Sequence, residues 1–293
     1  MNFAQQHKLY QAGCEDKLEE VVARYFTKGS QVSSAAAYAL LGGGKRVRGV
    51  MVQAVCDLLG GSAAAALAFA AAMEMVHAFS LVHDDLPCMD DDDFRRGKPS
   101  THVAFGEANA LLAGDMLLAE AFSVLADAEC SEAQRILAVK LLGRATGAAG
   151  MIYGQELDLA YEDAAASAEV LQTIHTHKTG ALFTCAVRLG QLAAGSAPGS
   201  AAALEEYAKN VGLVFQIVDD ILDVTSTTEA LGKPVGSDAE NAKNTFVTLH
   251  GIPGARKEVQ RLTGQAVAGL QASYGDKAWF LTEYANQLAA RVK

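Results

Sequence analysis

Apolar residues recur every three or four positions along most of the chain, the spacing of an amphipathic α-helix. In residues 3–26, for example, Leu18, Val21 and Tyr25 fall at helical spacing. Strict alternation of apolar and polar residues, the pattern of a half-buried strand, is scarce. Glycines and prolines separate the periodic segments and mark helix ends. The pattern therefore predicts an all-α protein.

Capping residues and helix breakers predict where the helices begin and end. Ser33 or Ser34 can cap a short helix that ends at Leu41, and Pro87 stops the helix that begins at Ala63. No segment has the composition of a linker between two cores, so we expect a single domain over residues 1–293. The expected helices cover residues 3–26, 33–41, 50–59, 63–85, 109–128, 132–145, 147–159, 168–194, 201–225, 246–249, 253–274 and 277–292.

Composition narrows the class of protein. Hydrophobic residues make up 51% of the chain, and the net charge of −10 argues against a general nucleic-acid surface. The five cysteines form no C-x-x-C pair, which favours reduced thiols in a cytoplasmic protein. The most apolar stretch, Ala63 to Val82, carries Glu74 and His77, so we interpret it as a buried core helix. We expect no stable membrane insertion.

Six aspartates lie between Asp84 and Asp93, directly after this apolar run. Like charges this close raise one another's pKa values unless a cation lies among them. A solvated acidic loop is the plain alternative. Because Asp84 and Asp85 end a core helix, however, they need a partner, and clustered carboxylates suit Mg²⁺ or Ca²⁺. Asp84, Asp85 and Asp90 are the strongest candidate ligands.

A second acidic cluster ends another long apolar helix. Gln216, Asp219 or Asp220, and Asp223 are three or four residues apart and therefore share one helical face. One such stripe alone could simply face solvent. Two acidic clusters on two long apolar helices instead favour a shared internal cavity that holds metal ions.

Basic residues after a glycine-rich segment form a candidate phosphate-binding site. Three glycines at 42–44 precede Lys45 and Arg48, which we expect one helical turn apart on one face, as in a phosphate site. A helix-connecting turn with solvated charges is the alternative. His77, seven residues before Asp84, lies near its face or is a satisfied core histidine.

The combined inventory indicates a substrate with a polyphosphate head and an apolar tail. Several Mg²⁺ ions and cationic side chains can stabilise the charge that develops on a departing diphosphate. The candidate cations are Lys45, Arg48, Arg95, Arg96, Lys178 and Lys233.

The chain resembles the trans-isoprenyl diphosphate synthases over nearly its whole length. Asp84-Asp85-x-x-x-x-Asp90 with Arg95-Arg96 is similar to the first aspartate-rich motif of that family, and Asp219-Asp220-x-x-Asp223 is similar to the second. The resemblance implies an orthogonal bundle of roughly ten or more helices around a central cavity, and a homodimer. Further matching segments are Gly44–Arg48, Gly154–Asp158, Lys178-Thr179, Phe215-Gln216 and Gly232-Lys233.

The family mechanism that this resemblance implies is ionisation of an allylic diphosphate, condensation with isopentenyl diphosphate, and elimination of a proton. Three Mg²⁺ ions on the allylic diphosphate would be held by Asp84, Asp85, Asp90, Asp219, Asp220 and Asp223. The same diphosphate would be bound by Arg95, Lys178 and Lys233. Isopentenyl diphosphate would be bound by Lys45, Arg48, His77 and Arg96. The allylic cation would be faced by Gln216 and the backbone around Lys178 and Thr179.

The resemblance also implies how product length is set. Phe79 lies five residues before Asp84, about 7.5 Å along the helix, where short-chain members carry an aromatic floor of the tail pocket; Ser80 lies beside it. With the two-residue insertion Pro87-Cys88, this pattern implies a bacterial-type enzyme that joins isopentenyl diphosphate to dimethylallyl and geranyl diphosphate to make farnesyl diphosphate. Geranylgeranyl diphosphate is the alternative product.

Two other classes of protein are the alternatives to a chain-elongating synthase. A class I terpene cyclase would not need an isopentenyl diphosphate site, and a non-catalytic subunit would be expected to lack an aspartate motif.

Gly49 stands where the family commonly has proline, which we expect to loosen the helix start without removing a ligand. We also expect residues 226–244 to order over the bound diphosphate as a lid.

Overall fold

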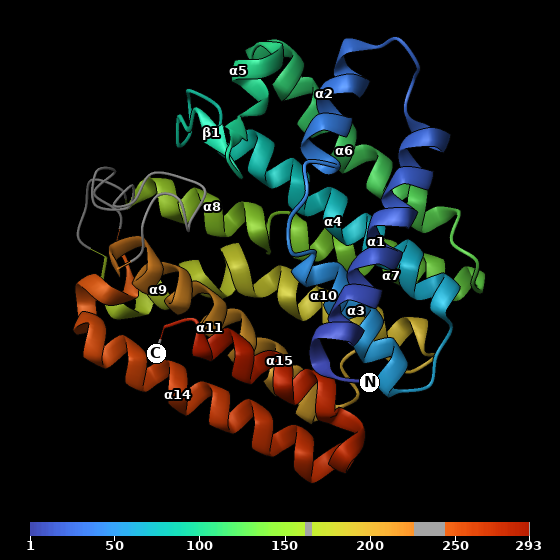
Figure 1. The fold of residues 1–293 in the computed structure, drawn as a ribbon. Helices are drawn as coiled ribbons and strands as arrows, with labels where there is room; N and C mark the ends of the chain where they lie inside the picture. The colour runs from blue at the N-terminus through green and yellow to red at the C-terminus, as the bar shows by residue number, and fades with distance from the viewer. Residues whose placement is uncertain (162–165, 226–243, 293) are drawn as a thin grey trace.

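The computed structural model describes residues 1–161, 166–225 and 244–292. Almost all regular structure in the described residues is helical and packs into a bundle, which confirms the predicted all-α class (Figure 1). The long helices are α1 Phe3–Tyr25, α2 Gln31–Leu40, α3 Val47–Leu58, α4 Ala63–Asp84, α6 Glu107–Ala126, α7 Glu132–Thr146, α8 Met151–Ala160, α10 Ala181–Ala193, α11 Ala202–Thr225, α14 Phe246–Tyr274 and α15 Trp279–Ala290. The short elements are α5 Thr101–Phe105, α9 Ala168–Ile174, the π-helix η1 His175–Gly180, the 3₁₀-helix η2 Gly275–Ala278, and the strands β1 Phe94–Arg95 and β2 Lys98–Pro99.

Helix α4 lies in the middle of the bundle and contacts α1, α3, α6 and α10 (Figure 1). Its alanines allow these neighbours to approach closely, while Phe69, Met73 and Met75 fill the space between them. By length and composition, α4, α6 and the span Glu132–Ala160 could each cross a membrane. The fold buries 78% of the most apolar window of α4, as expected for a core helix.

Two predicted helix starts, at residues 33 and 50, lie two and three residues too late. Ser30, not Ser33 or Ser34, caps α2, because its hydroxyl accepts a hydrogen bond from the backbone N–H of Ser33 at 3.2 Å. Helix α3 begins at Val47 instead of at residue 50, after Arg46 adopts a left-handed conformation with φ 47°. Lys45 therefore precedes the helix, and it does not share a helical face with Arg48.

The predicted continuous helix over 168–194 is interrupted. The six residues of η1 form a π-helix between α9 and α10. A π-helical turn keeps the chain direction and requires neither proline nor glycine at a defined position, so the sequence carries no clear signal for it. This segment contains Lys178 and Thr179, and it places both on the cavity between α4 and α11.

The loop after the first acidic cluster forms a two-stranded hairpin, with Arg95 opposite Lys98. Ser100 occupies the N-cap position of α5. The predicted break between helices 246–249 and 253–274 is confirmed as a kink within α14, where Gly251 has φ 67°.

Candidate active site

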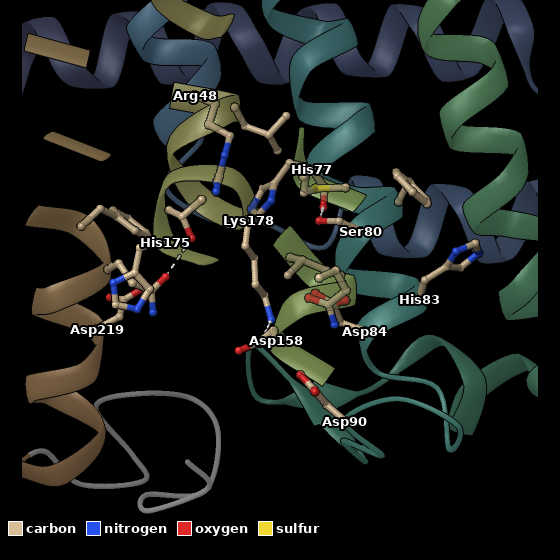
Figure 2. Close-up of a pocket in the computed structure, with 18 of the residues that line it drawn as sticks. Arg48, His77, Ser80, His83, Asp84, Asp90, Asp158, His175, Lys178 and Asp219 are labelled. Atoms are coloured by element: carbon tan, nitrogen blue, oxygen red, sulfur yellow. Dashed lines mark hydrogen bonds and ion pairs between the residues drawn. The ribbon is translucent and has the colours of Figure 1, made fainter. Parts of the chain in front are cut away.

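A cavity of about 1020 Å³ opens between the C-terminal ends of α4 and α11. Its lining combines acidic and basic side chains with apolar ones, among them Phe79, Leu118 and Leu182. Figure 2 shows Asp84 and Asp90 on one side of Lys178 and Asp219 on the other. The cavity thus brings together both acidic clusters, which are far apart in the sequence.

The first acidic wall is built by a turn at the end of α4. The backbone N–H of Asp90 donates to the Asp84 carbonyl at 2.8 Å, so the loop folds back and places both residues on the cavity. Asp85 instead is buried, and its carboxylate accepts hydrogen bonds from Arg95, with Nε at 2.9 Å. Asp85 does not line this cavity, and its role as a metal ligand stays a prediction.

The second acidic wall lies on α11. Asp219 lines the cavity and is partly exposed. Both oxygens of Asp220 accept hydrogen bonds, from Gln216 Nε2 at 2.9 Å and from the Phe246 N–H at 2.7 Å. Asp223 is buried and is not among the lining residues. Of the three, Asp219 is therefore best placed to meet a ligand; the other two stay predicted metal ligands.

Lys178 lies between the two acidic walls. Its ammonium donates to Asp158 Oδ2 on α8 at 2.6 Å. Burial alone would lower the pKa of Lys178, but the carboxylates of Asp158 and Asp84 more than offset this and raise it. A Cβ at Gly154 would overlap the backbone of Lys178, so glycine there allows α8 and η1 to touch. The lysine is charged and held in place.

Thr179 and Gln216 form one hydrogen-bonded unit on the cavity wall. The Thr179 hydroxyl donates to Gln216 Oε1 at 2.8 Å, and the Gln216 amide in turn donates to Asp220. The amide orientation is therefore fixed by partners on both sides. That Gln216 and the backbone around Thr179 face the allylic cation stays a prediction.

Lys45, Arg48 and His77 line one region of the cavity. The Arg48 guanidinium is buried over the rings of Phe183 at 5.3 Å and Phe215 at 5.9 Å. Its Nε has no hydrogen-bond partner among the described residues. Burial and the nearby guanidinium of Arg48 lower the pKa of His77, so this histidine is neutral at pH 7. A buried cation with an unused donor is arranged for an anionic ligand.

Gly49 does not loosen the start of α3, contrary to the expectation from the sequence. Its backbone N–H donates to Glu74 Oε1 at 2.8 Å, a bond that proline could not make. Arg46, at the N-cap, has no side-chain cap of its own, and its Nη1 lies 3.8 Å from Glu74 Oε2. A buried carboxylate on α4 therefore secures the first turn of α3, which carries Arg48.

Two further predicted cations have partners within the protein. Arg95 lines the cavity while it binds Asp85, and Arg96 donates to the Gly43 carbonyl. A Cβ at Gly44 would lie 2.8 Å from Cζ of Arg96, so the glycine loop makes room for this guanidinium. Lys233 and the predicted lid, apart from Asn244, lie outside the described residues.

The apolar end of the cavity is bounded by Phe79 and Ser80 on α4 and by Leu118 on α6. Phe79 is 6% exposed, and Met75 and Val76, in the turn of α4 before it, are fully buried. Phe79 therefore lies on the cavity wall, and its role as the floor of the tail pocket stays a prediction. Ser80 contributes a small side chain whose hydroxyl bonds the His77 carbonyl at 2.9 Å.

The cavity walls fit Mg²⁺ chemically. Among the described residues, no three acidic, histidine or cysteine side chains converge on one point that could hold an ion. Mg²⁺ is commonly bound by one or two carboxylates together with substrate phosphates and water. Asp84, Asp90 and Asp219 offer such oxygens, on two walls that face a common space.

Several lining residues had no role assigned from the sequence. Asp158 belongs to a matching segment, but only the structure shows that it holds Lys178. The sequence marks Glu74 as an acid in an apolar run but indicates no partner for it, although a buried charge needs one. Arg291 reaches the cavity, with Nη1 3.6 Å from Asp219 Oδ1, and His175 lines it with an Nδ1 that has no partner in the described part of the chain. No sequence pattern indicated either one.

Comparisons with known proteins agree with this geometry. The family model described as polyprenyl synthetase matches residues 30–277. The chain is 45% identical over 275 residues to farnesyl diphosphate synthase of Escherichia coli K12, covering 92% of both chains. It is 44% identical over 266 residues to chloroplastic geranylgeranyl pyrophosphate synthase 9 of Arabidopsis thaliana, covering 89% of this chain and 74% of that one.

The fold also has close structural relatives. A geranyltransferase from Helicobacter pylori, solved in complex with magnesium and isoprenyl diphosphate, superposes with a TM-score of 0.84 at 30% identity. The match covers 97% of this chain and 96% of the other. With two acidic walls, a fixed lysine and an apolar end in one cavity, the chain belongs to the polyprenyl synthetase family and is a trans-prenyltransferase.

Proposed function

We propose that the protein is a Mg²⁺-dependent prenyltransferase that joins isopentenyl diphosphate to dimethylallyl diphosphate and then to geranyl diphosphate, giving farnesyl diphosphate. The observation that carries this proposal is one cavity lined by two acidic walls, by buried cations and by apolar side chains that include Phe79 and Leu118. The E. coli relative named farnesyl diphosphate synthase supports the product, and the Helicobacter complex with magnesium supports the metal.

The allylic diphosphate would lie between the two acidic walls. Asp84, Asp90 and Asp219 would hold Mg²⁺ together with its phosphate oxygens, with three ions in all as the family resemblance implies. When bound, the metal neutralises charge on the departing pyrophosphate. Lys178, fixed by Asp158, donates to the same phosphates and remains charged throughout. Arg95 lies at the edge of this region and would contribute after a small rearrangement.

Isopentenyl diphosphate would bind beside Lys45, Arg48 and His77. Arg48 is a buried cation on the cavity wall, and the neutral His77 can donate a hydrogen bond without adding charge. Arg96 would exchange its bond to the Gly43 carbonyl for one to phosphate. A second diphosphate site is what a chain-elongating enzyme needs and what a terpene cyclase does not.

The reaction then follows from how the two substrates meet. The allylic C–O bond breaks, and its electron pair leaves with pyrophosphate, so the remaining fragment is an allylic cation. The double bond of isopentenyl diphosphate attacks this cation and forms the new C–C bond. Pyrophosphate accepts the proton that is then lost. Gln216 and Thr179 hold oxygen atoms on the wall that would face the cation.

Product length is the sharpest test of the proposal, because relatives of similar identity carry both the farnesyl and the geranylgeranyl names. Purified protein supplied with Mg²⁺, isopentenyl diphosphate and dimethylallyl diphosphate should yield mainly a fifteen-carbon product by chromatography. Phe79→Ala should lengthen it, since the floor of the tail pocket is removed. A twenty-carbon wild-type product, or an unchanged distribution in the variant, would refute Phe79 as the floor.

The proposal includes a homodimer in the cytoplasm. The family resemblance supports the dimer. So do large apolar side chains that remain exposed on α6 and on α5 and α7, which each pack against α6: Val103, Leu111, Leu112, Ile136 and Leu137. Five cysteines without a disulfide among them are compatible with a reducing compartment.

A further inference from the structure

His83 lies beside Phe79 at the apolar end of the cavity. The two rings, one helical turn apart on α4, meet edge to face, with centroids 5.1 Å apart and planes at 82°. Both residues line the cavity. In Figure 2 the His83 ring points away from the Asp84 carboxylate and from Lys178, so it does not belong to the diphosphate end.

Two features of α6 hold the His83 ring in place. Nε2 lies 2.9 Å from the Leu111 carbonyl oxygen, which can only accept, so Nε2 must carry the proton. At Gly114 a Cβ would overlap the imidazole, so the glycine leaves a notch that the ring fills. The ring thus connects α4 to α6 at the level of the tail pocket.

We propose that His83 is a specificity-positioning residue, whose ring packs against Phe79 and keeps it in the orientation that closes the tail pocket. This inference rests on the proposed function, in which Phe79 is the floor. His83 touches no reacting atom. It acts through the orientation of a second side chain, and therefore on product length and not on the chemical step.

The physical basis is packing. Phe79 has rotamers that a neighbouring ring can exclude, and an edge-to-face pair favours one relative orientation. Without the His83 ring, the space next to Gly114 becomes available to the Phe79 ring. The floor would then open for part of the time, and a longer chain could enter.

The test compares product distributions of variants under identical conditions with dimethylallyl and isopentenyl diphosphate. His83→Ala should raise the ratio of twenty- to fifteen-carbon product roughly two- to tenfold, the range that loss of one edge-to-face contact predicts. His83→Phe keeps a ring and should stay near the wild-type ratio. Gly114→Ala, which fills the notch and displaces the imidazole, should shift the ratio in the same direction as His83→Ala.

His250→Ala is the matched control. Phe246 and His250 are also four residues apart on one helix, with rings 4.4 Å apart, but neither lines the cavity. This variant should leave the ratio unchanged. Melting temperature and the rate of isopentenyl diphosphate consumption, recorded for each variant, separate a change of floor from a loss of fold.

The outcomes distinguish the inference from the proposed function. If the wild-type protein makes no prenyl product, the proposed function fails. If Phe79→Ala lengthens the product and folded, active His83→Ala does not, only the inference about His83 fails. A ratio that shifts equally in His83→Ala and His83→Phe would also overturn it, because the ring would then have no part in holding Phe79.

Discussion

At the scale of single residues, burial sets the protonation states around the cavity. Burial raises the pKa of Asp84 to about 6 in the metal-free protein; the Lys178 cation opposes this, and the like charge of Asp90 adds to it. Burial lowers the pKa of His175 to about 4, so this ring is neutral at pH 7. The diphosphate end therefore has one carboxylate that a bound cation would make markedly more acidic.

Mg²⁺ binding should accordingly release a proton near pH 6. A raised folded-state pKa means that the neutral carboxyl is favoured below pH 6, whereas Mg²⁺ requires the carboxylate. The apparent Mg²⁺ affinity at this position should fall about tenfold per pH unit below that pKa. Calorimetry with a diphosphate analogue, in buffers of different ionisation enthalpy, measures the proton. The Asp84→Asn variant should release fewer protons on Mg²⁺ binding than the wild-type protein. Equal proton release by the variant and the wild type would contradict the raised pKa of Asp84.

At the scale of elements, the junction of α8 and η1 positions the central lysine. Gly154 lets α8 approach the backbone of Lys178 closely, and Asp158, one turn later, reaches its ammonium. Gly154 and Asp158, both on α8, thus set the position of η1 and the direction of the Lys178 side chain. The contact is between backbone atoms, which cannot yield as a flexible side chain can.

Gly154→Ala should therefore reduce both stability and activity. The added methyl group should displace η1 and reduce stability by about 1–3 kcal/mol, as in other overpacked sites, and lower kcat/KM for the allylic substrate. Gly264→Ala is the control, because an added methyl group at this exposed helical glycine would meet none of the described residues and should gain about 0.5–1 kcal/mol. Thermal melts measure both changes. Equal effects of the two substitutions would show that the close contact does not matter.

The elements differ in how far the sequence predicts them. The period of three to four residues finds most helices, because each buries one apolar face. It does not find η1, since a π-helical turn leaves that period almost unchanged on either side. It also misplaces the start of α3, because the capping group for its first turn is Glu74, a residue of another helix. Local pattern cannot show a cap supplied by tertiary structure.

At the scale of the whole molecule, the bundle brings α4 and α11 to opposite sides of one cavity. The sequence alone indicates two acidic clusters of similar form and favours a shared internal cavity for them. Which carboxylates reach the space depends on packing: Asp84, Asp90 and Asp219 do so directly, whereas Asp85 and Asp223 are buried outside it. Spacing along a helix does not decide which of two adjacent aspartates points inward.

The exposed apolar residues of α6 should lie in the dimer interface. Leu111 and Leu112 are 48% and 51% exposed, and Leu→Glu substitution at both would place charges where a second copy packs. We expect the double variant to be monomeric by light scattering. Leu249→Glu, at a residue 40% exposed on α14, should leave the dimer intact. A double variant that stays dimeric would place the interface elsewhere.

Dependence of pyrophosphate release on isopentenyl diphosphate tests the central claim most directly. With Mg²⁺ and dimethylallyl diphosphate alone, release should be slow, and addition of isopentenyl diphosphate should start it together with a fifteen-carbon product. Arg48→Gln should abolish most of this acceleration, about 10²-fold, because a buried phosphate ligand is lost. Rapid release without isopentenyl diphosphate, or none with both substrates, would contradict a chain-elongating prenyltransferase.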